Sequence, residues 1–243
     1  MSFVVYGLAM PVAQNIALIR GRIDDAARRV GRRPDEITLM AVSKTFPPAL
    51  VREAYDSGLR QFGENRVQEF AEKIEALRDL HGVTWHMIGH LQTNKAFKAT
   101  ELFTAIDSVD SLRLAEKLND SAQRIGRKLA TLIEINVGKE TAKSGLSEES
   151  PELENLLRAA PQMEHLEFRG LMTIPPWFED PQQARPYFRK LRELRDRIAA
   201  QKLPKLDLEV LSMGMSHDFE VAIEEGSSCL RVGTAIFGER AVR

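Results

Sequence analysis

The sequence predicts a single α/β domain that folds as a closed (β/α)8 TIM barrel. Eight short apolar runs alternate with segments whose apolar residues recur at helical spacing, as in a parallel sheet with crossover helices. The chain has 243 residues, a length typical of one barrel. A doubly wound open sheet is the alternative, but this number of strands at this length favours the closed barrel.

The first half of the chain supplies four of the expected strands. Apolar residues recur at helical spacing over residues 11–30 and Gly31 follows them, so this segment is the first expected helix. Residues 37–44 form an apolar run that two nearby prolines stop, which is typical of a buried strand. The same two patterns predict helices over 48–57, 65–79 and 92–99, and strands over 59–63, 83–89 and 102–107.

The second half repeats the alternation. Leu112, Ala115 and Leu118 mark a helix, and residues 129–137 form the strongest strand pattern in the chain. A leucine-rich helix that Pro161 ends comes next. The remaining expected elements are strands over 168–174, 206–213 and 229–232 and helices over 181–202 and 218–225.

Composition indicates a small-molecule partner rather than a nucleic acid or a membrane. The 34 basic and 35 acidic residues nearly cancel, and no long basic tract occurs. No apolar stretch approaches the roughly 20 residues of a membrane-spanning helix. The one cysteine, Cys229, cannot form an internal disulfide, which fits a reducing, cytoplasmic compartment. Residues 1–10 are interpreted as an N-terminal extension before a single domain at 11–243.

Lys44 lies at the exit of the first expected strand, within the segment AVSKTFPP. Burial disfavours the charged form of a lysine, so a lysine in such a place tends to be a more nucleophilic amine. An amine of this kind can form an imine with an aldehyde. A lysine that extends from the strand end into solvent is the alternative interpretation.

Glycine and polar residues follow seven of the eight expected strands, at the end where barrels hold their active sites. Ser212, Gly214 and Ser216 lie between the seventh strand and a helix, and Gly233 and Thr234 lie at the junction after the eighth. Unpaired backbone N–H groups at such junctions favour a phosphate, although ordinary strand-to-helix turns would also explain these residues. A phosphate site facing a strand-end lysine is the arrangement that pyridoxal 5'-phosphate (PLP) requires.

Six segments, in order, resemble the signatures of the pyridoxal phosphate homeostasis protein family. They are AVSKTFPP, YDSGLRQFGENRVQEF, WHMIGHLQTNK, INVGKETAKSGL, GLMTIPPW and LSMGMSHDFEVAIEEGSSCLRVGTAIFGER. The resemblance covers about residues 11–240 and implies a barrel like the N-terminal domain of alanine racemase. It further implies that Lys44 binds PLP as a Schiff base, and that the protein acts in vitamin B6 balance as a carrier or buffer without established turnover.

The resemblance also implies the residues around the cofactor. Asn65 is expected beside the ring, Arg231 at the pyridine nitrogen, and the phosphate at Ser212, Gly214, Gly233 and Thr234. An arginine can only donate hydrogen bonds, so it would keep the pyridine nitrogen unprotonated and make PLP a weak electron sink. A phosphate-binding role for Arg231 is the alternative.

Two enzymatic functions compete with a carrier. A PLP-dependent amino-acid racemase needs a second acid or base opposite Lys44. The similar alanine racemases take a tyrosine from a separate domain, whereas Tyr6, Tyr55 and Tyr187 are not well placed here. A Schiff-base aldolase that acts directly on a phosphorylated sugar is the third possibility. The carrier interpretation implies PLP-dependent apo-enzymes as partners and a monomer.

A metal site is not expected. His86 and His90 share one face of a strand, but no third ligand is apparent and zinc sites use three or four. Trp85 and Trp177 are expected to pack rather than to stack on a ligand.

Three further lysines lie near expected strand exits: Lys95, Lys139 and Lys143. One hypothesis is that one of them receives a second PLP molecule during delivery. Solvated loop lysines are the alternative.

Overall fold

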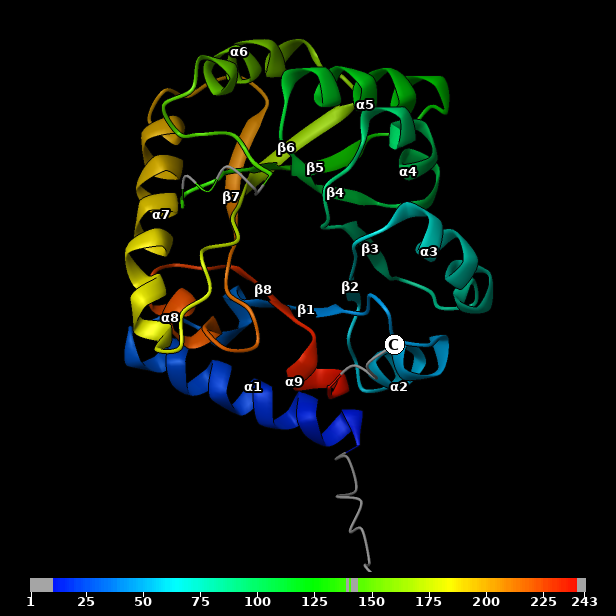
Figure 1. Ribbon diagram of the computed structural model, residues 1–243, viewed down its shortest axis with the longest axis vertical. Helices are drawn as coiled ribbons and strands as arrows, with labels where there is room; N and C mark the ends of the chain where they lie inside the picture. The colour runs from blue at the N-terminus through cyan, green and yellow to red at the C-terminus, as the bar shows by residue number, and fades with distance from the viewer. Residues whose placement is uncertain (1–10, 139, 141–143, 240–243) are drawn as a thin grey trace, which may run out of the picture.

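The computed structural model describes residues 11–138, 140 and 144–239, so the expected N-terminal extension, Lys139 and Lys143 lie outside the described residues. Eight strands close into a barrel in sequence order, and every neighbouring pair is parallel. Figure 1 shows the helices arranged outside the ring of strands. The structure therefore confirms the predicted (β/α)8 barrel.

The strands are β1 (Thr38–Val42), β2 (Gln61–Glu64), β3 (Thr84–Met87), β4 (Ala105–Val109), β5 (Leu129–Glu134), β6 (Leu166–Met172), β7 (Leu206–Ser212) and β8 (Cys229–Val232). The α-helices are α1 (Val12–Arg29), α2 (Pro48–Asp56), α3 (Val67–Lys73), α4 (Ala96–Leu102), α5 (Leu112–Arg124), α6 (Pro151–Ala159), α7 (Arg185–Ala199), α8 (Phe219–Glu224) and α9 (Thr234–Phe237). Short 3-10 helices are η1 (Pro34–Glu36), η2 (Ile74–Leu77), η3 (Thr93–Lys95), η4 (Ala160–Gln162) and η5 (Pro181–Ala184).

Local sequence explains where several helices begin. Ser111 Oγ accepts a hydrogen bond from the Leu114 N–H at the start of α5, and Ser150 Oγ accepts one from the Leu153 N–H at the start of α6. Pro48 is the first residue of α2, where its missing N–H is not needed. α1 buries an isoleucine-rich face and packs against α2, α8 and α9, which joins the two ends of the described chain.

Two expected strands and three expected helices differ from the structure in the ways that follow. β5 ends at Glu134 rather than at residue 137, because Ile135 forms an isolated bridge with Leu146 and the chain leaves the sheet. β4 begins at Ala105, because the preceding apolar residues complete α4. The helices expected over 65–79, 92–99 and 181–202 each contain a 3-10 turn at one end.

Two apolar regions hold the barrel together. The larger lies between the strands and the helices, and its fully buried aromatic residues are Phe62, Phe70, Phe103, Phe168, Phe188 and Phe219. The smaller comprises Met40, Val42, Ile88 and Cys229, with Val210 packed against it. Because Ala41 belongs to the outer region and side chains alternate along a strand, this smaller cluster lies inside the barrel.

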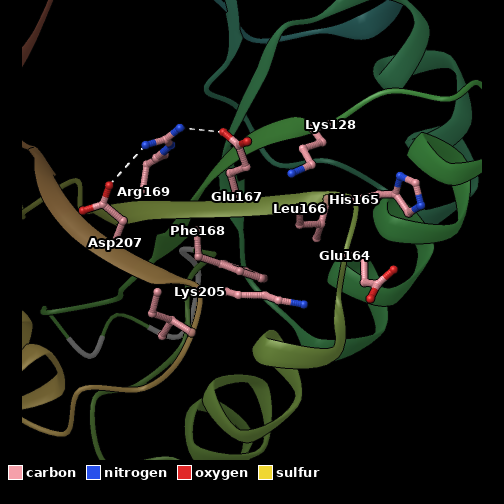
Figure 2. A pocket seen from close by; sticks show the side chains of 10 residues that line it. Lys128, Glu164, His165, Leu166, Glu167, Phe168, Arg169, Lys205 and Asp207 are labelled. Carbon is pink, nitrogen blue, oxygen red and sulfur yellow. Dashed lines mark hydrogen bonds and ion pairs between the residues drawn. The ribbon is translucent and has the colours of Figure 1, made fainter.

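A cavity of about 690 Å³ opens at the amino ends of β5, β6 and β7, as Figure 2 shows. Its wall includes Arg169, which donates hydrogen bonds to Glu167 at 2.7 Å and to Asp207 at 3.1 Å. The residue after β1, Lys44, lies at the opposite, carboxyl end of the barrel. The cavity is therefore separate from the site that the sequence predicts.

Among the residues that the structure describes, no helix is both long and apolar enough to cross a lipid bilayer.

Candidate functional site

Lys44 lies on a turn between β1 and α2, at the carboxyl end of the barrel. Ser43 before it is fully buried, Lys44 is half-buried and Thr45 after it is exposed. Thr45 has a φ of +67°, in the left-handed region that a β-branched residue rarely adopts. The turn therefore has an unusual backbone conformation directly beside the candidate nucleophile.

The ends of β2 and β8 flank this turn. The Ser43 N–H donates to the Gly63 carbonyl at 3.0 Å, and half-buried Asn65 follows β2 directly. On the other side Ala41 pairs with Val232, and a Cβ atom on Gly233 would come within 3.3 Å of the Val42 carbonyl oxygen. Lys44, Asn65 and Gly233 thus lie at the carboxyl ends of three neighbouring strands.

The turns after β7 and β8 contact each other. Ser216 Oγ accepts a hydrogen bond from the Ala235 N–H at 3.3 Å, and the Arg231 N–H donates to the Gly214 carbonyl at 3.0 Å. Gly214 has a φ of +94°, and a Cβ atom there would lie 2.6 Å from the Ala222 Cβ, so glycine is required. This contact brings together the two glycine turns that the sequence singles out.

Several backbone N–H groups at these turns make no hydrogen bond within the described part of the chain. Those of Ser216, Gly233 and Thr234 are among them. The helices that follow are short, with six residues in α8 and four in α9, so a helix macrodipole contributes little here. Any anion affinity of this corner therefore depends on the backbone N–H groups, as the sequence predicts, and on nearby hydroxyls rather than on a helix dipole.

Arg231 lies inside the barrel and is only 3% exposed. Its Nη1 donates to Ser212 Oγ and its Nη2 donates to the Thr173 carbonyl, both at 2.7 Å. Burial lowers the pKa of the guanidinium, while Asp107, Glu134 and Asp218 oppose that shift. Arginine keeps its proton in proteins even so, and the site contains a fixed, buried positive charge.

Glu134, at the carboxyl end of β5, is a site residue that the sequence analysis missed. It is 5% exposed, and its Oε2 atom has no hydrogen-bond partner within the described residues. Its pKa is raised to about 7, mainly by burial and also by Asp110, while Arg231, His90 and a Ser144 hydrogen bond oppose the rise. The sequence does contain a signal for it, because Glu134 is an acidic residue within the strongest apolar run, where a buried strand is expected.

The pKa of Glu134 predicts a pH-dependent stability. Between its ordinary value of 4.5 and about 7, the folded chain keeps a proton that the unfolded chain releases. The free energy of unfolding should therefore fall by about 3 kcal/mol as the pH rises through this window and then stay constant. Urea unfolding of Glu134→Gln should lack this decline, whereas Glu116→Gln, at an exposed position of α5, should retain it. An unchanged pH profile in Glu134→Gln would contradict the assignment.

The two histidines, His86 and His90, each contact a different aspartate rather than each other. His86 Nδ1 lies 3.0 Å from Asp107 Oδ1, and His86 Nε2 lies 2.8 Å from Gln61 Oε1. His90 follows β3, is exposed, and its Nδ1 lies 2.9 Å from Asp110 Oδ2. Over residues 11–138, 140 and 144–239, no group of three possible metal ligands occurs.

The expectation that both tryptophans pack is correct for one of them. Trp85 is buried, with ring centroids 5.3 Å from Phe62 and 4.9 Å from Phe70. Trp177 is 74% exposed and stacks on His217, so the packing expectation is wrong for this residue.

Among the described residues, the tyrosines, Lys95 and Cys229 do not add a functional group to the candidate site. The Tyr55 hydroxyl donates to the His81 carbonyl, and Tyr187 stacks on Phe178. Lys95 is half-buried in η3. Tyr6 lies outside the described residues. Cys229 is buried, which raises the pKa of its thiol to about 12, so this cysteine is not a reactive thiolate.

Comparison with known proteins gives the class of this barrel. The family model described as alanine racemase, N-terminal domain, matches residues 15–241. An alanine racemase from Clostridium difficile has the same fold, with a TM-score of 0.72 over 96% of this chain and 57% of that chain, at 13% identity. The chain is therefore an alanine-racemase-like barrel.

More similar proteins define the family within that class. The pyridoxal phosphate homeostasis protein of Aquifex aeolicus is 46% identical over 95% of this chain and 99% of its own length. The Escherichia coli K12 protein of the same name is 44% identical over 94% and 97%. PipY of Synechococcus elongatus, solved with PLP bound, has a TM-score of 0.82 and 38% identity over 93% and 100%. This chain belongs to the pyridoxal phosphate homeostasis protein family.

Proposed function

We propose that this protein binds PLP covalently through Lys44 and acts in PLP homeostasis, as a carrier or buffer of the cofactor. The observation that carries the proposal is the position of Lys44 on a strand-end turn, two residues after Val42, which lies against Gly233 at the corner where the backbone N–H groups of Ser216, Gly233 and Thr234 have no partner among the described residues. A relative with PLP bound and relatives named for PLP homeostasis support it.

The residues at the mouth fit each part of PLP. The unpaired N–H groups of Ser216, Gly233 and Thr234 suit the phosphate, since backbone N–H groups bind phosphate oxygens well. Inside the barrel, Val42 and Ile88 provide an apolar surface suited to the face of a ring, with Met40 packed beneath them. Arg231 provides a buried donor group that suits the pyridine nitrogen or the phosphate.

The chain's own groups would act as follows. The Lys44 amine would hold PLP through its aldehyde carbon as a C=N bond, with the carbonyl oxygen and the two amine protons leaving as water. Asn65 would position the ring from the end of β2, and Arg231 would donate a hydrogen bond without giving up its proton. When bound, PLP supplies an electron sink for amino-acid chemistry, and an unprotonated pyridine nitrogen makes that sink weak.

A carrier of PLP requires proteins that receive the cofactor and a compartment in which they meet. The proposed recipients are PLP-dependent apo-enzymes, and the proposed state is a cytoplasmic monomer. The single buried cysteine fits a reducing compartment.

The test is an absorbance spectrum of the purified protein with PLP, followed by borohydride reduction and peptide mapping. A visible band and a single reduced adduct at Lys44 are expected. Incubation of the loaded protein with a PLP-dependent apo-enzyme should then restore the activity of that enzyme. Labelling of other lysines with equal yield, or no visible band, would refute the covalent site.

An amino-acid racemase is a second candidate function, and Glu134 is the observation that favours it. β5 is the fourth strand from β1 in both directions around the barrel, so its end lies across the mouth from the turn of Lys44. A buried carboxyl with an unpartnered oxygen and a pKa near 7 could serve as the opposing acid or base. Exchange of the Cα proton of alanine in D2O that Glu134→Gln abolishes would support this function, and no exchange would exclude it.

A further inference from the structure

A buried ion cluster lies directly behind the turn that carries Lys44. The cluster comprises Ser43, Glu64, Glu69 and Lys73, and we call it the Lys73 cluster. Lys73 is 8% exposed and Glu64 is fully buried, which is unusual for both residue types. Charged groups in such positions require several well-placed partners.

Lys73 Nζ has three acceptors around it, which matches the three N–H bonds of an ammonium group. It donates to the Ser43 carbonyl at 2.9 Å, to Glu64 Oε1 at 2.8 Å and to Glu69 Oε1 at 3.4 Å. Ser43 Oγ also donates to Glu64 Oε1, at 2.8 Å. The strand β2 and the helix α3 thus both reach the residue that precedes Lys44.

The same cluster reaches the residue that follows Lys44. Glu69 Oε1 accepts a hydrogen bond from the Thr45 N–H at 2.5 Å. Glu69 and Lys73 are four residues apart on α3, so they project from the same face of the helix. The two backbone positions on either side of Lys44 are therefore both bonded to one face of α3.

The backbone of this turn needs such support. Thr45 has a φ of +67°, which is unfavourable for a β-branched residue. Without the bonds at Ser43 and Thr45, the turn could relax to a more common conformation. The Lys44 Cβ atom would then point in a different direction and carry the amine away from the mouth.

We propose that Lys73 and Glu69 are positioning residues that fix the Lys44 turn for attack on the PLP aldehyde. This inference rests on the proposed function, because it concerns the same lysine. Neither residue is assigned contact with the cofactor. Their effect acts through the backbone of Ser43 and Thr45, so it should alter the rate and the affinity of covalent binding rather than its chemistry.

Lys73→Met tests the proposal, since it keeps the length of the side chain and removes all three hydrogen bonds. We expect the Kd for PLP to rise at least tenfold and the visible band to form at least tenfold more slowly. Pyridoxal, which lacks the phosphate, should show the same slower reaction, because the defect lies at the aldehyde end. Leu118→Ala, in the core under α5, is the control: it lowers stability far from the site and should leave both values unchanged.

Glu69 gives an independent test that does not depend on the buried lysine. Glu69→Ala removes the acceptor of the Thr45 N–H and should also weaken and slow PLP binding. Glu69→Gln keeps an oxygen that can accept this bond and should restore most of the rate. This rescue would not be expected if Glu69 only supported the packing of α3.

The outcomes separate the two proposals. If the unaltered protein forms no visible band with PLP, the proposed function fails. If it forms the band, and Lys73→Met and Glu69→Ala both match its Kd and rate within twofold, the positioning role is wrong and the proposed function stands. If Lys73→Met does not fold, the two Glu69 variants test the positioning role alone. The role is supported if Glu69→Ala binds PLP slowly and Glu69→Gln regains most of the rate. It is wrong if either result is not found.

Discussion

Lys44→Ala should eliminate the visible absorbance of the PLP-loaded protein and the adduct found after borohydride reduction. The covalent bond is lost, while the backbone N–H groups of Ser216, Gly233 and Thr234 and the apolar surface inside the barrel remain. We therefore expect PLP to bind non-covalently, about 100-fold more weakly, which corresponds to roughly 3 kcal/mol of binding free energy. Equilibrium dialysis and absorbance titration measure these quantities directly.

Two controls make this result specific. Lys44→Arg keeps the positive charge but cannot form the covalent bond, so it should lose the visible band as completely as Lys44→Ala. Lys95→Ala removes a half-buried lysine in η3 and should keep the band. If Lys44→Ala retains a visible band that Lys95→Ala abolishes, the covalent site has been placed on the wrong residue. No residual binding at all in Lys44→Ala would count against the hypothesis of a second PLP-receiving lysine.

The sequence predicted the barrel because the fold leaves a repeated pattern along the chain. Each strand is a short apolar run and each helix has its own apolar face, so all eight pairs can be recognised separately. The ends of the elements were less predictable. Residues 135–137 continue the apolar pattern of β5, but Ile135 instead pairs with Leu146, a contact that no local pattern encodes.

Site residues were predictable where their position next to a strand can be read from the neighbouring sequence. Lys44 follows an apolar strand, and Gly214 and Gly233 lie between a strand and a helix, so their surroundings are visible in the sequence. The Lys73 cluster has no such signal, because Lys73 and Glu69 look like ordinary polar residues on an amphipathic helix. Only the packing of α3 against the ends of β1 and β2 shows that Lys73 is buried and that both residues are bonded to the backbone beside Lys44.

Trp177 illustrates the opposite error. A tryptophan in an apolar segment is normally a packing residue, and the segment 170–177 is rich in apolar residues. The segment leaves the barrel at the end of β6, so Trp177 lies in a loop where it contacts His217 and solvent. Residue type alone therefore cannot decide burial once a strand has ended.

Arg231→Met should have the second large effect, on stability as well as on cofactor binding. The arginine donates hydrogen bonds to Ser212 Oγ and to the Thr173 carbonyl, and both acceptors are buried. Each buried acceptor left without its partner costs about 1–3 kcal/mol, so with two acceptors the apo-protein should lose roughly 2–6 kcal/mol of unfolding free energy. Ser212→Ala, which removes only one of these acceptors, should cost less in the same urea titration.

The loss of this charge should also be visible in Glu134. Arg231 lowers the pKa of that carboxyl, so Arg231→Met should raise the pKa above its value of about 7. The pH at which stability stops falling should then move upward, because the folded chain would hold its proton to a higher pH. An unchanged profile would mean that the guanidinium has little electrostatic effect at the end of β5.

A comparison of PLP with pyridoxal then assigns the role of Arg231. If the guanidinium contacts the pyridine nitrogen, Arg231→Met should weaken both compounds by a similar factor, because both contain the ring. If it contacts the phosphate, only PLP should weaken, and its advantage over pyridoxal should shrink. We expect the first result, because Arg231 is bonded to Ser212 and Thr173 inside the barrel, whereas the unpaired N–H groups of Ser216, Gly233 and Thr234 lie at the turns beyond the ends of β7 and β8.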